Sequence, residues 1–236
     1  MLNFIDTSNW QGGYSVAALQ GVDGIIAKAT EGTGYVDSYC DSTVQQCIGL
    51  GLPWGFYHFA GNGGAVEEAD FFVDNCPNYF GHGIPVLDWE GDQDVAWVNA
   101  FVNLVHERTG VWPWIYANPW RFNQGGVEPN CARWVASYPE IAHPTFEQAE
   151  CWDCPSADGN VVAWQFCSDG RVDGFSGDLD CSLFYGDKEQ WSAYAFGDNT
   201  SSGTMDNSGS DNAVSDGIPK TSTLENDDYR VTIERK

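Results

Sequence analysis

The fold is decided by one stretch, Gly83-Ile84-Pro85-Val86-Leu87-Asp88-Trp89-Glu90-Gly91. A Gly-Ile-Pro entry, a short apolar run and a closing glycine are typical of a buried barrel strand. Because side chains alternate along a strand, Asp88 and Glu90 project from the same face with Cα atoms about 6.6 Å apart. Like charge and loss of water both raise a carboxyl pKa, which keeps a general acid protonated near neutral pH. Two ordinary acids at a solvated strand end would show the same spacing, so the surrounding sequence has to decide.

Strands and helices alternate through the first half of the sequence. Predicted strands begin at residues 2, 22, 54, 83, 112, 133, 161 and 177, and helical spacing predicts helices over 37–50, 65–75 and 93–109. Such alternation indicates parallel βαβ units, and thinner helices in the second half indicate an irregular barrel. We therefore predict an α/β fold, an irregular single-domain β/α barrel like a TIM barrel. It covers 1–186, and the domain ends at 187–196.

Acidic residues stand at the ends of several predicted strands. Asp6 follows the first apolar run, Asp88 and Glu90 end the central strand, and Asp180 belongs to the last strand unit. Sites in β/α barrels lie at the C-terminal ends of the strands, so we expect these four carboxylates to gather there. The alternative for Asp6 is a plain turn-capping role.

The charge balance is strongly acidic, with 10 Lys and Arg against 34 Asp and Glu among 236 residues and a net charge of −24. Such a chain cannot neutralise a run of phosphates, so we exclude nucleic acid as a partner. The sequence contains no run of about 18 apolar residues, so we predict no membrane insertion. Its first residues lack the charged and apolar regions of a signal peptide.

Eight cysteines are many for a reduced cytosolic enzyme. Cys151 and Cys154 form half of a zinc knuckle, without a second C-x-x-C or a histidine cluster. We therefore predict structural cysteines, no metal and no cofactor. Cys167 and Cys181 flank a predicted hairpin, and we expect these two cysteines to form a disulfide.

The composition changes near the C-terminus. Gly, Ser, Asn, Asp and Thr predominate from Gly197 to Thr223, which predicts a flexible acidic linker over 197–236. Within it, 229–233 has strand character but is too short to fold alone. We expect this part to lead into a further domain.

Seven short motifs follow one another along the chain. They are Phe4–Gly12, Ile26–Gly32, Gly55–Phe59, Pro85–Glu90, Ile115–Asn118, Trp164-Gln165 and Gly177–Asp180. In order and spacing they resemble glycoside hydrolase family 25, the muramidases, a class of lysozymes that includes many phage endolysins. The resemblance covers about residues 2–186, in line with the domain length that the pattern predicts. It implies an irregular β/α barrel that cleaves the β-1,4 bond between N-acetylmuramic acid and N-acetylglucosamine in bacterial peptidoglycan.

The resemblance also implies roles for the four acids. By motif position, the resemblance implies that Glu90 is the general acid and Asp88 its partner. It implies that Asp6 and Asp180 are flanking acids of the cleft. The chain departs from the family at Asp180-Cys181-Ser182, where an apolar residue and Asn usually follow the acid. We expect a monomer that acts outside the producing cytoplasm on the wall of a target bacterium, released by holin-type lysis.

Aromatic rings stack on sugars without needing net charge. We predict a substrate-binding role for five aromatic residues at or near strand ends, Tyr35, Tyr57, Tyr116, Trp134 and Tyr138. Core packing is the alternative for each of them. His58 lies within an apolar strand, which favours a buried structural histidine over a catalytic one.

The residue pattern is also compatible with two other functions. One is a chitinase-like hydrolase of N-acetylglucosamine polymers, although its usual motif has more acids on the central strand. The other is a non-catalytic glycan-binding module, which the presence of all four acids disfavours. Because Asp88 and Glu90 share one face of one strand, they cannot easily flank a sugar. This predicts a retaining mechanism in which the substrate's own 2-acetamido group is the nucleophile.

Overall fold

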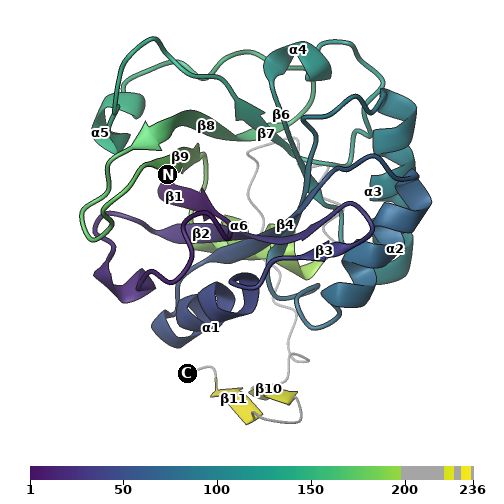
Figure 1. The fold of residues 1–236 in the computed structure, drawn as a ribbon, viewed down its shortest axis with the longest axis horizontal. Helices are drawn as coiled ribbons and strands as arrows, with labels where there is room; N and C mark the ends of the chain where they lie inside the picture. The colour runs from purple at the N-terminus through teal and green to yellow at the C-terminus, as the bar shows by residue number, and fades with distance from the viewer. Residues whose placement is uncertain (198–220, 226–229, 235–236) are drawn as a thin grey trace, which may run out of the picture. The chain divides into compact units, whose positions relative to one another are not determined.

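The structure, a computed structural model, describes residues 1–197, 221–225 and 230–234. The chain divides into two units, Met1–Thr200 and Ser201–Lys236. In the first unit the strands form one sheet that closes on itself (Figure 1). The barrel strands are β1 (Leu2–Thr7), β2 (Gly24–Glu31), β4 (Trp54–Phe59), β5 (Ile84–Asp88), β6 (Trp114–Ala117), β7 (Arg133–Ala136), β8 (Val161–Gly170) and β9 (Leu179–Phe184). The predicted α/β barrel is confirmed.

The strand directions make the barrel irregular. Neighbouring strands run parallel from β1 through β2 and β4 to β8, but β9 runs antiparallel to both β8 and β1. The pairing of β1 with β2 closes the ring, and the short strand β3 (Tyr35–Val36) lies antiparallel along β2. A hairpin therefore replaces the last crossover helix of a regular β/α barrel.

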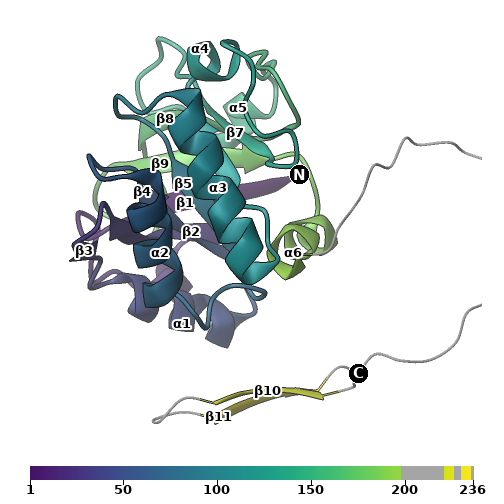
Figure 2. The same cartoon turned by 90° about the vertical axis from the view of Figure 1, so that its right-hand side faces the viewer.

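Helices cover the outside of the ring of strands (Figure 1). They are η1 (Val16–Ala18, a 3-10 turn), α1 (Cys40–Leu50), α2 (Ala65–Asn75), α3 (Val95–Thr109), α4 (Pro119–Phe122), α5 (Phe146–Ala149) and α6 (Lys188–Phe196). The three long helices all belong to the first half, and α2 and α3 pack side by side (Figure 2). The thin helices expected in the second half are the single turns α4 and α5.

Local signals fix the bounds of the longest helix. At its start the Asp94 side chain accepts a hydrogen bond from the backbone N–H of Trp97, and at its end Gly110 adopts a left-handed φ of 73°. The buried stripe of this helix consists of Val98, Phe101, Val102 and Val105. The apolar residues that recur at helical spacing in the sequence therefore form the face that packs against the barrel.

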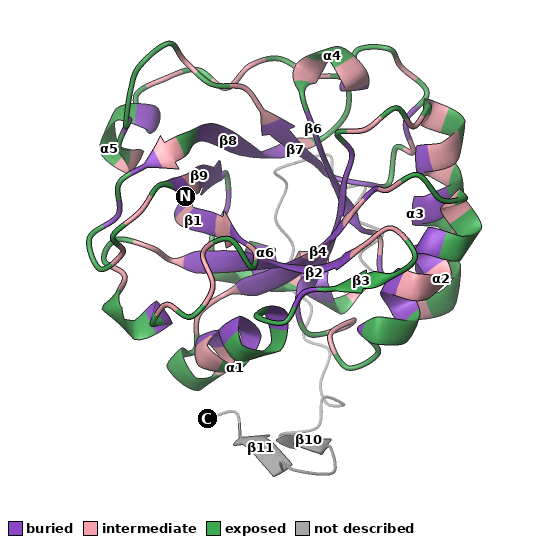
Figure 3. Ribbon diagram, in the orientation of Figure 1, coloured by how far each residue is buried: buried purple, intermediate pink, exposed green. Residues whose placement is uncertain are grey.

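The barrel interior is filled by side chains, and the ring of strands is almost wholly buried (Figure 3). Helix α6, which the sequence pattern did not predict, covers the end of the barrel where the parallel strands begin. Its Trp191 is 2 % exposed, donates a hydrogen bond from Nε1 to the carbonyl of Trp54 and packs edge-on against Phe4 and Phe184. Helix α6 thus closes this end of the barrel, and the strand ends at the opposite end remain available for a site.

The cysteines are all free thiols. Cys167 in β8 and Cys181 in β9 lie directly opposite each other, as the expected hairpin return requires. The disulfide that we expected between them is not present in the structure, although the register would bring both side chains to one place.

In the second unit β10 (Thr221–Glu225) pairs antiparallel with β11 (Arg230–Glu234). The strand expected over 229–233 is therefore present as β11. The linker was predicted over 197–236, and its residues 198–220, 226–229 and 235–236 lie outside the described residues. No helix in the described part of the chain is long and apolar enough to cross a bilayer.

Candidate active site

The four predicted acids line one cavity of about 280 Å³ at the open end of the barrel. Asp6 lies in β1, Asp88 is the last residue of β5, and Glu90 follows two residues later. Asp180 is the second residue of β9, and it reaches the same end because β9 is antiparallel and sets Asp180 opposite Asp6. The four carboxylates therefore lie together as expected. Asp180, however, comes from the beginning of its strand and not from the C-terminal end.

Burial and mutual repulsion change the pKa values of three of these acids. Burial, followed by the charge of Asp180, raises the pKa of Asp6 well above its ordinary value. Burial and the charge of Glu90 do the same for Asp88. Burial and Glu90 raise the pKa of Asp180 to about 6. These three carboxyl groups therefore stay protonated at a pH at which isolated carboxyl groups would be ionised.

Glu90 lies in a different environment from Asp88. Asp88 is buried at the strand end, whereas Glu90 lies beyond the strand and is exposed. The expectation that both point to one face is confirmed, since both line the same cavity. An exposed carboxyl group beside buried ones is well placed to meet a ligand that enters from solvent.

A glutamine orders the floor of the cleft. Gln165 in β8 donates a hydrogen bond from Nε2 to Oδ2 of Asp6 over 2.8 Å. Its Oε1 accepts hydrogen bonds from the hydroxyl groups of Tyr116 (2.6 Å) and Tyr138. Gln165 lies in one of the seven motifs, but we did not predict a role for it.

A buried lysine also faces the acids. Lys28 lines the cavity, and its Nζ lies 2.5 Å from Oε2 of Glu31 and 4.8 Å from the ring centre of Phe59. Its positive charge lowers the pKa of Asp88 and so opposes part of the effect of burial. Lys28 lies in the motif Ile26–Gly32, but we did not predict a role for it in the site.

Four of the five predicted aromatic residues line the cavity, namely Tyr57, Tyr116, Trp134 and Tyr138. Trp134 is only 2 % exposed, donates from Nε1 to Ser182 Oγ and packs against Phe4, so most of its ring belongs to the core. Tyr35 does not line the cavity. It lies on β3 with its hydroxyl 3.4 Å from Oδ2 of Asp37.

Trp10 was not predicted and is the most exposed aromatic side chain at the cavity, with 86 % of its surface accessible. Its backbone is nevertheless fixed, because Ser8 Oγ accepts a hydrogen bond from its N–H and the neighbouring Asn9 N–H donates to buried Asp37. The signal was present in the motif Phe4–Gly12, where a tryptophan occupies a polar turn.

A second hollow, of about 330 Å³, adjoins the cleft at Glu90. Glu90, Tyr116 and Tyr138 line both hollows, and Asn118 and Ser137 belong to the second. Together the two hollows offer a longer groove than either alone, as the binding of a polymer chain requires.

His58 is fully buried, as expected of a structural histidine. Its Nδ1 lies 2.8 Å from Thr30 Oγ1 and its Nε2 3.0 Å from Glu68 Oε2. Burial lowers the pKa of His58. Glu68 also accepts hydrogen bonds from the backbone N–H groups of Gly61 and Gly63, so this pair fixes the loop after β4.

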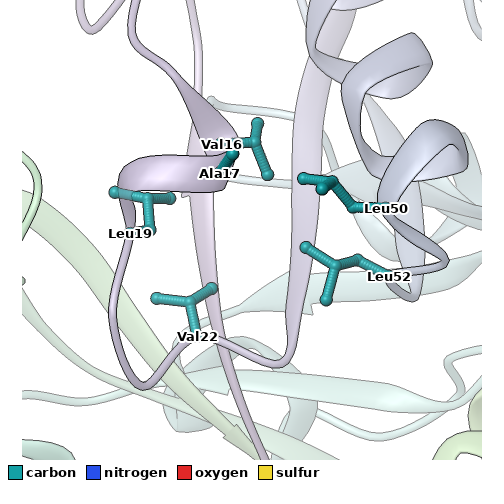
Figure 4. A pocket seen from close by; sticks show the side chains of 6 residues that line it. All are labelled: Val16, Ala17, Leu19, Val22, Leu50 and Leu52. Carbon is teal, nitrogen blue, oxygen red and sulfur yellow. The ribbon is translucent and has the colours of Figure 1, made fainter.

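The remaining features offer less chemistry. Among the described residues no group of three or more His, Cys, Asp or Glu side chains is arranged to hold a metal ion. An apolar hollow of about 230 Å³ lies beside η1 and the end of α1 (Figure 4). It is lined by Val16, Ala17, Leu19, Val22, Leu50 and Leu52. It contains no group that could transfer a proton or attack a substrate.

Comparisons with known proteins place this cleft in a family. The profile of the glycosyl hydrolases family 25 matches residues 5–175. Lysozyme M1 of Streptomyces globisporus is 30 % identical over 206 residues, which cover 77 % of this chain and 67 % of that protein. The N,O-diacetylmuramidase of Chalaropsis is 32 % identical over 131 residues, covering 47 % of this chain and 60 % of that protein. This chain thus spans about two thirds or less of these relatives' lengths.

Solved structures agree with the sequence comparison. The crystal structure of the bacterial lysozyme from Streptomyces coelicolor superposes with a TM-score of 0.68 at 26 % identity, covering 82 % of this chain and 96 % of that one. The family match includes Asp6, Asp88 and Glu90, and the barrel strands that carry them have the same fold. The chain therefore belongs to family 25 of the glycosyl hydrolases and carries a hydrolase domain of the lysozyme type.

Proposed function

We propose that this chain is an N-acetylmuramidase that hydrolyses the β-1,4 bond between N-acetylmuramic acid and N-acetylglucosamine in bacterial peptidoglycan, with retention of configuration. Family membership and the lysozyme and muramidase relatives support this activity. One observation supports the mechanism most directly. Oδ1 of Asp88 is buried in the cleft and has no hydrogen-bond partner among the described residues.

A buried carboxylate oxygen without a partner is costly, so such an atom in a cleft favours a donor supplied by the ligand. The 2-acetamido N–H of an N-acetylated sugar is a donor of the right kind. A hydrogen bond from that N–H would favour the ionised form of Asp88 against the effect of burial. Asp88 would then orient the acetamido group and stabilise the positive charge that develops on it.

Glu90 is the proposed general acid and base. In the first step its proton passes to the glycosidic oxygen while the acetamido oxygen attacks C1 and the C1–O bond breaks. In the second step water attacks C1, Glu90 takes a proton from it, and the bond to the acetamido oxygen breaks. Two inversions at C1 leave the product in the β configuration.

The other cleft residues are proposed to bind the glycan. Asp6 and Asp180 keep protons more readily than ordinary acids and can donate to or accept from sugar hydroxyl groups. The rings of Tyr57 and Tyr138 line the groove and can stack on the sugars. Trp10 adds an exposed ring at its edge.

Location, assembly and domain organisation belong to the same proposal. We propose a monomer that acts on the bacterial wall outside the producing cytoplasm, with catalysis in 1–186 and the tail leading to a wall-binding domain. Cleavage of peptidoglycan by the lysozyme-type domain requires such a location, and the acidic chain has to bind its substrate by shape and stacking.

Clearing of a suspension of purified bacterial walls tests this function, with a soluble chitin oligomer assayed in parallel. We expect the walls to clear, and Glu90→Gln to slow clearing by at least about 100-fold at an unchanged melting temperature. Glu107→Gln, at an exposed position on α3, is the matched control and should clear normally. Faster hydrolysis of chitin would indicate the chitinase-like alternative, and wall binding without clearing would indicate a glycan-binding module.

A further inference from the structure

The segment 89–93, which carries Glu90, lies beyond the end of β5, and only its first residue, Trp89, still bonds through its backbone N–H to the neighbouring strand β6 within the described chain. We infer that Arg121 is a positioning residue that holds this segment, and through it the Glu90 carboxyl group, in place for catalysis. This inference rests on the proposed role of Glu90 as the general acid and adds a residue from a different element to the machinery.

Arg121 contacts three consecutive residues of the segment. Its Nη2 donates hydrogen bonds to the backbone carbonyls of Glu90 over 2.7 Å and of Gly91 over 2.6 Å. Its guanidinium carbon lies 5.0 Å from the ring centre of Trp89. Hydrogen bonds from a charged donor are shorter and stronger than neutral ones. Arginine, unlike lysine, combines such donors with a flat face that can stack on an indole.

Trp89 makes this clamp rigid. Its side chain is 1 % exposed, its Nε1 donates to the carbonyl of Gln93 over 2.8 Å, and its backbone N–H donates to the carbonyl of Tyr116 over 2.9 Å. The ring on which Arg121 stacks therefore cannot move. The exposed Glu90 side chain is left as the free part of an otherwise fixed segment.

Arg121 is itself held by helix α4. Asn118 caps this helix, and its Oδ1 accepts a hydrogen bond from the Arg121 backbone N–H over 3.1 Å. Phe122 is fully buried and fixes the helix to the barrel. Asn118 also lines the hollow beside Glu90, so the cap of α4 and the general acid share one wall of the cleft.

The opposite side of the segment is held independently. Gln93 donates from Nε2 to the carbonyl of Gly61 over 2.5 Å, and Gly61 is fixed in turn by Glu68. Besides the bond from the Trp89 N–H to β6, the segment thus has an attachment to the loop after β4 and one to α4. Among the hydrogen bonds of the described residues, only the one from Arg121 reaches the backbone of Glu90 itself.

Two other arginines of the described chain form ordinary ion pairs, whereas the buried Arg133 donates to backbone carbonyls away from the cleft. Arg108 pairs with Asp70 and Asp74 at 2.6 Å, and Arg171 pairs with Asp178 at 2.8 Å. Within the described residues Arg121 makes no such pair with a carboxylate, in a chain with a large excess of acids. Its donors go to the carbonyls that surround Glu90, as a positioning role requires.

The test compares Arg121→Met with Arg121→Lys and with the control Arg108→Met, using kcat and KM on solubilised wall glycan. A displacement of about 1 Å at a catalytic group can cost about 100-fold in rate, so we expect Arg121→Met to lower kcat by at least about 10-fold. KM and the melting temperature should stay nearly unchanged. Arg121→Lys retains a charged donor without the flat face and should recover part of kcat, while Arg108→Met should keep full kcat.

The Glu90→Gln background separates positioning from a general structural effect. If Arg121 acts through Glu90, Arg121→Met added to Glu90→Gln should cause no further loss of the residual rate. Full kcat in Arg121→Met would overturn the inference. So would a double variant in which Arg121→Met lowers the rate of Glu90→Gln by the same factor as it lowers the rate of the unaltered enzyme. If Glu90→Gln alone keeps normal activity, the proposed general acid fails instead, which is a distinct result.

A second variant covers the case in which Arg121→Met does not fold. Arg121→Ala leaves room for methylguanidinium, which should restore kcat in a concentration-dependent way. The same compound should leave the kcat of the control Arg108→Ala, which is expected to be normal, unchanged. Two results together would contradict the positioning role. The first is a folded Arg121→Ala enzyme that has lost kcat and does not respond to methylguanidinium. The second is an Arg121→Lys enzyme that is as slow as Arg121→Ala.

Discussion

Asp6 in β1 and Asp180 in β9 lie directly opposite each other across an antiparallel strand pair, although they stand near opposite ends of the catalytic part of the chain. The antiparallel β9 hairpin is the feature that brings the last acid into the cleft. A regular crossover would have placed the beginning of that strand at the closed end of the barrel. The charge of Asp180 consequently helps to raise the pKa of Asp6.

The raised pKa of Asp180 predicts a cost in stability. The pKa is about 6 in the folded chain against an ordinary value of 3.8, so the folded state binds this proton more tightly than the unfolded state. The free energy of unfolding should therefore fall as the pH rises between these values. We expect Asp180→Asn to raise the melting temperature at pH 7 by about 4 °C, and to give almost no gain near pH 4. The exposed Asp153→Asn is the control, and equal gains at both pH values would refute the assignment.

Trp10 predicts a contribution to glycan binding. A stacked aromatic pair is worth about 0.5–1.5 kcal/mol, so Trp10→Ala should raise KM for solubilised wall glycan by about 3- to 10-fold at an unchanged kcat. Trp10→Phe retains a flat ring and should restore most of the affinity. Steady-state kinetics decide the matter, and an unchanged KM in Trp10→Ala would mean that this ring does not contact the glycan.

The structure has Cys167 and Cys181 as free thiols, which corrects the pairing expected from the sequence, and the question left to experiment is whether an added oxidant joins them; we expect that it does. They face each other in register, and the hydrogen bond from the Cys181 thiol lowers the pKa of Cys167, which favours the reactive thiolate. Non-reducing peptide mapping after exposure to oxidised glutathione should show the Cys167–Cys181 peptide. Recovery of both thiols in the alkylated, unlinked form would be evidence against this pair.

The catalytic unit should not need the tail. Met1–Thr200 forms a unit of its own, closed at its base by Trp191 of α6. We expect truncation after Thr200 to leave the melting temperature and the cleavage of soluble wall fragments unchanged. Calorimetry of the truncated and full chains checks this, and a loss of several degrees would show that the tail stabilises the barrel.

The sequence predicts those parts of the site that follow from strand geometry. Alternation along the central strand places Asp88 and Glu90 on one face, and the structure confirms it. The different exposure of these two acids could not be predicted. It depends on where β5 ends and on Arg121, which contacts Trp89 and Glu90 from a helix about 30 residues further along the chain.

The aromatic residues show the same division. Tyr57 and Tyr116 were predicted from strand positions and do line the cavity, whereas Tyr35 lies on β3 and does not. Trp10 was missed because a tryptophan in a polar turn carries no periodic signal. Helix α6 was missed because its buried residues, Trp191 and Ala195, are too few to form a visible stripe.

The configuration of the first product tests the proposed mechanism most directly. Proton NMR of the first turnovers on a soluble peptidoglycan fragment, recorded before mutarotation, distinguishes the anomers of the new reducing end. If the acetamido group attacks first and Asp88 and Glu90 act as proposed, the product should appear as the β anomer. An initial α anomer would contradict substrate assistance, and would require an inverting water activated by another acid such as Asp6 or Asp180.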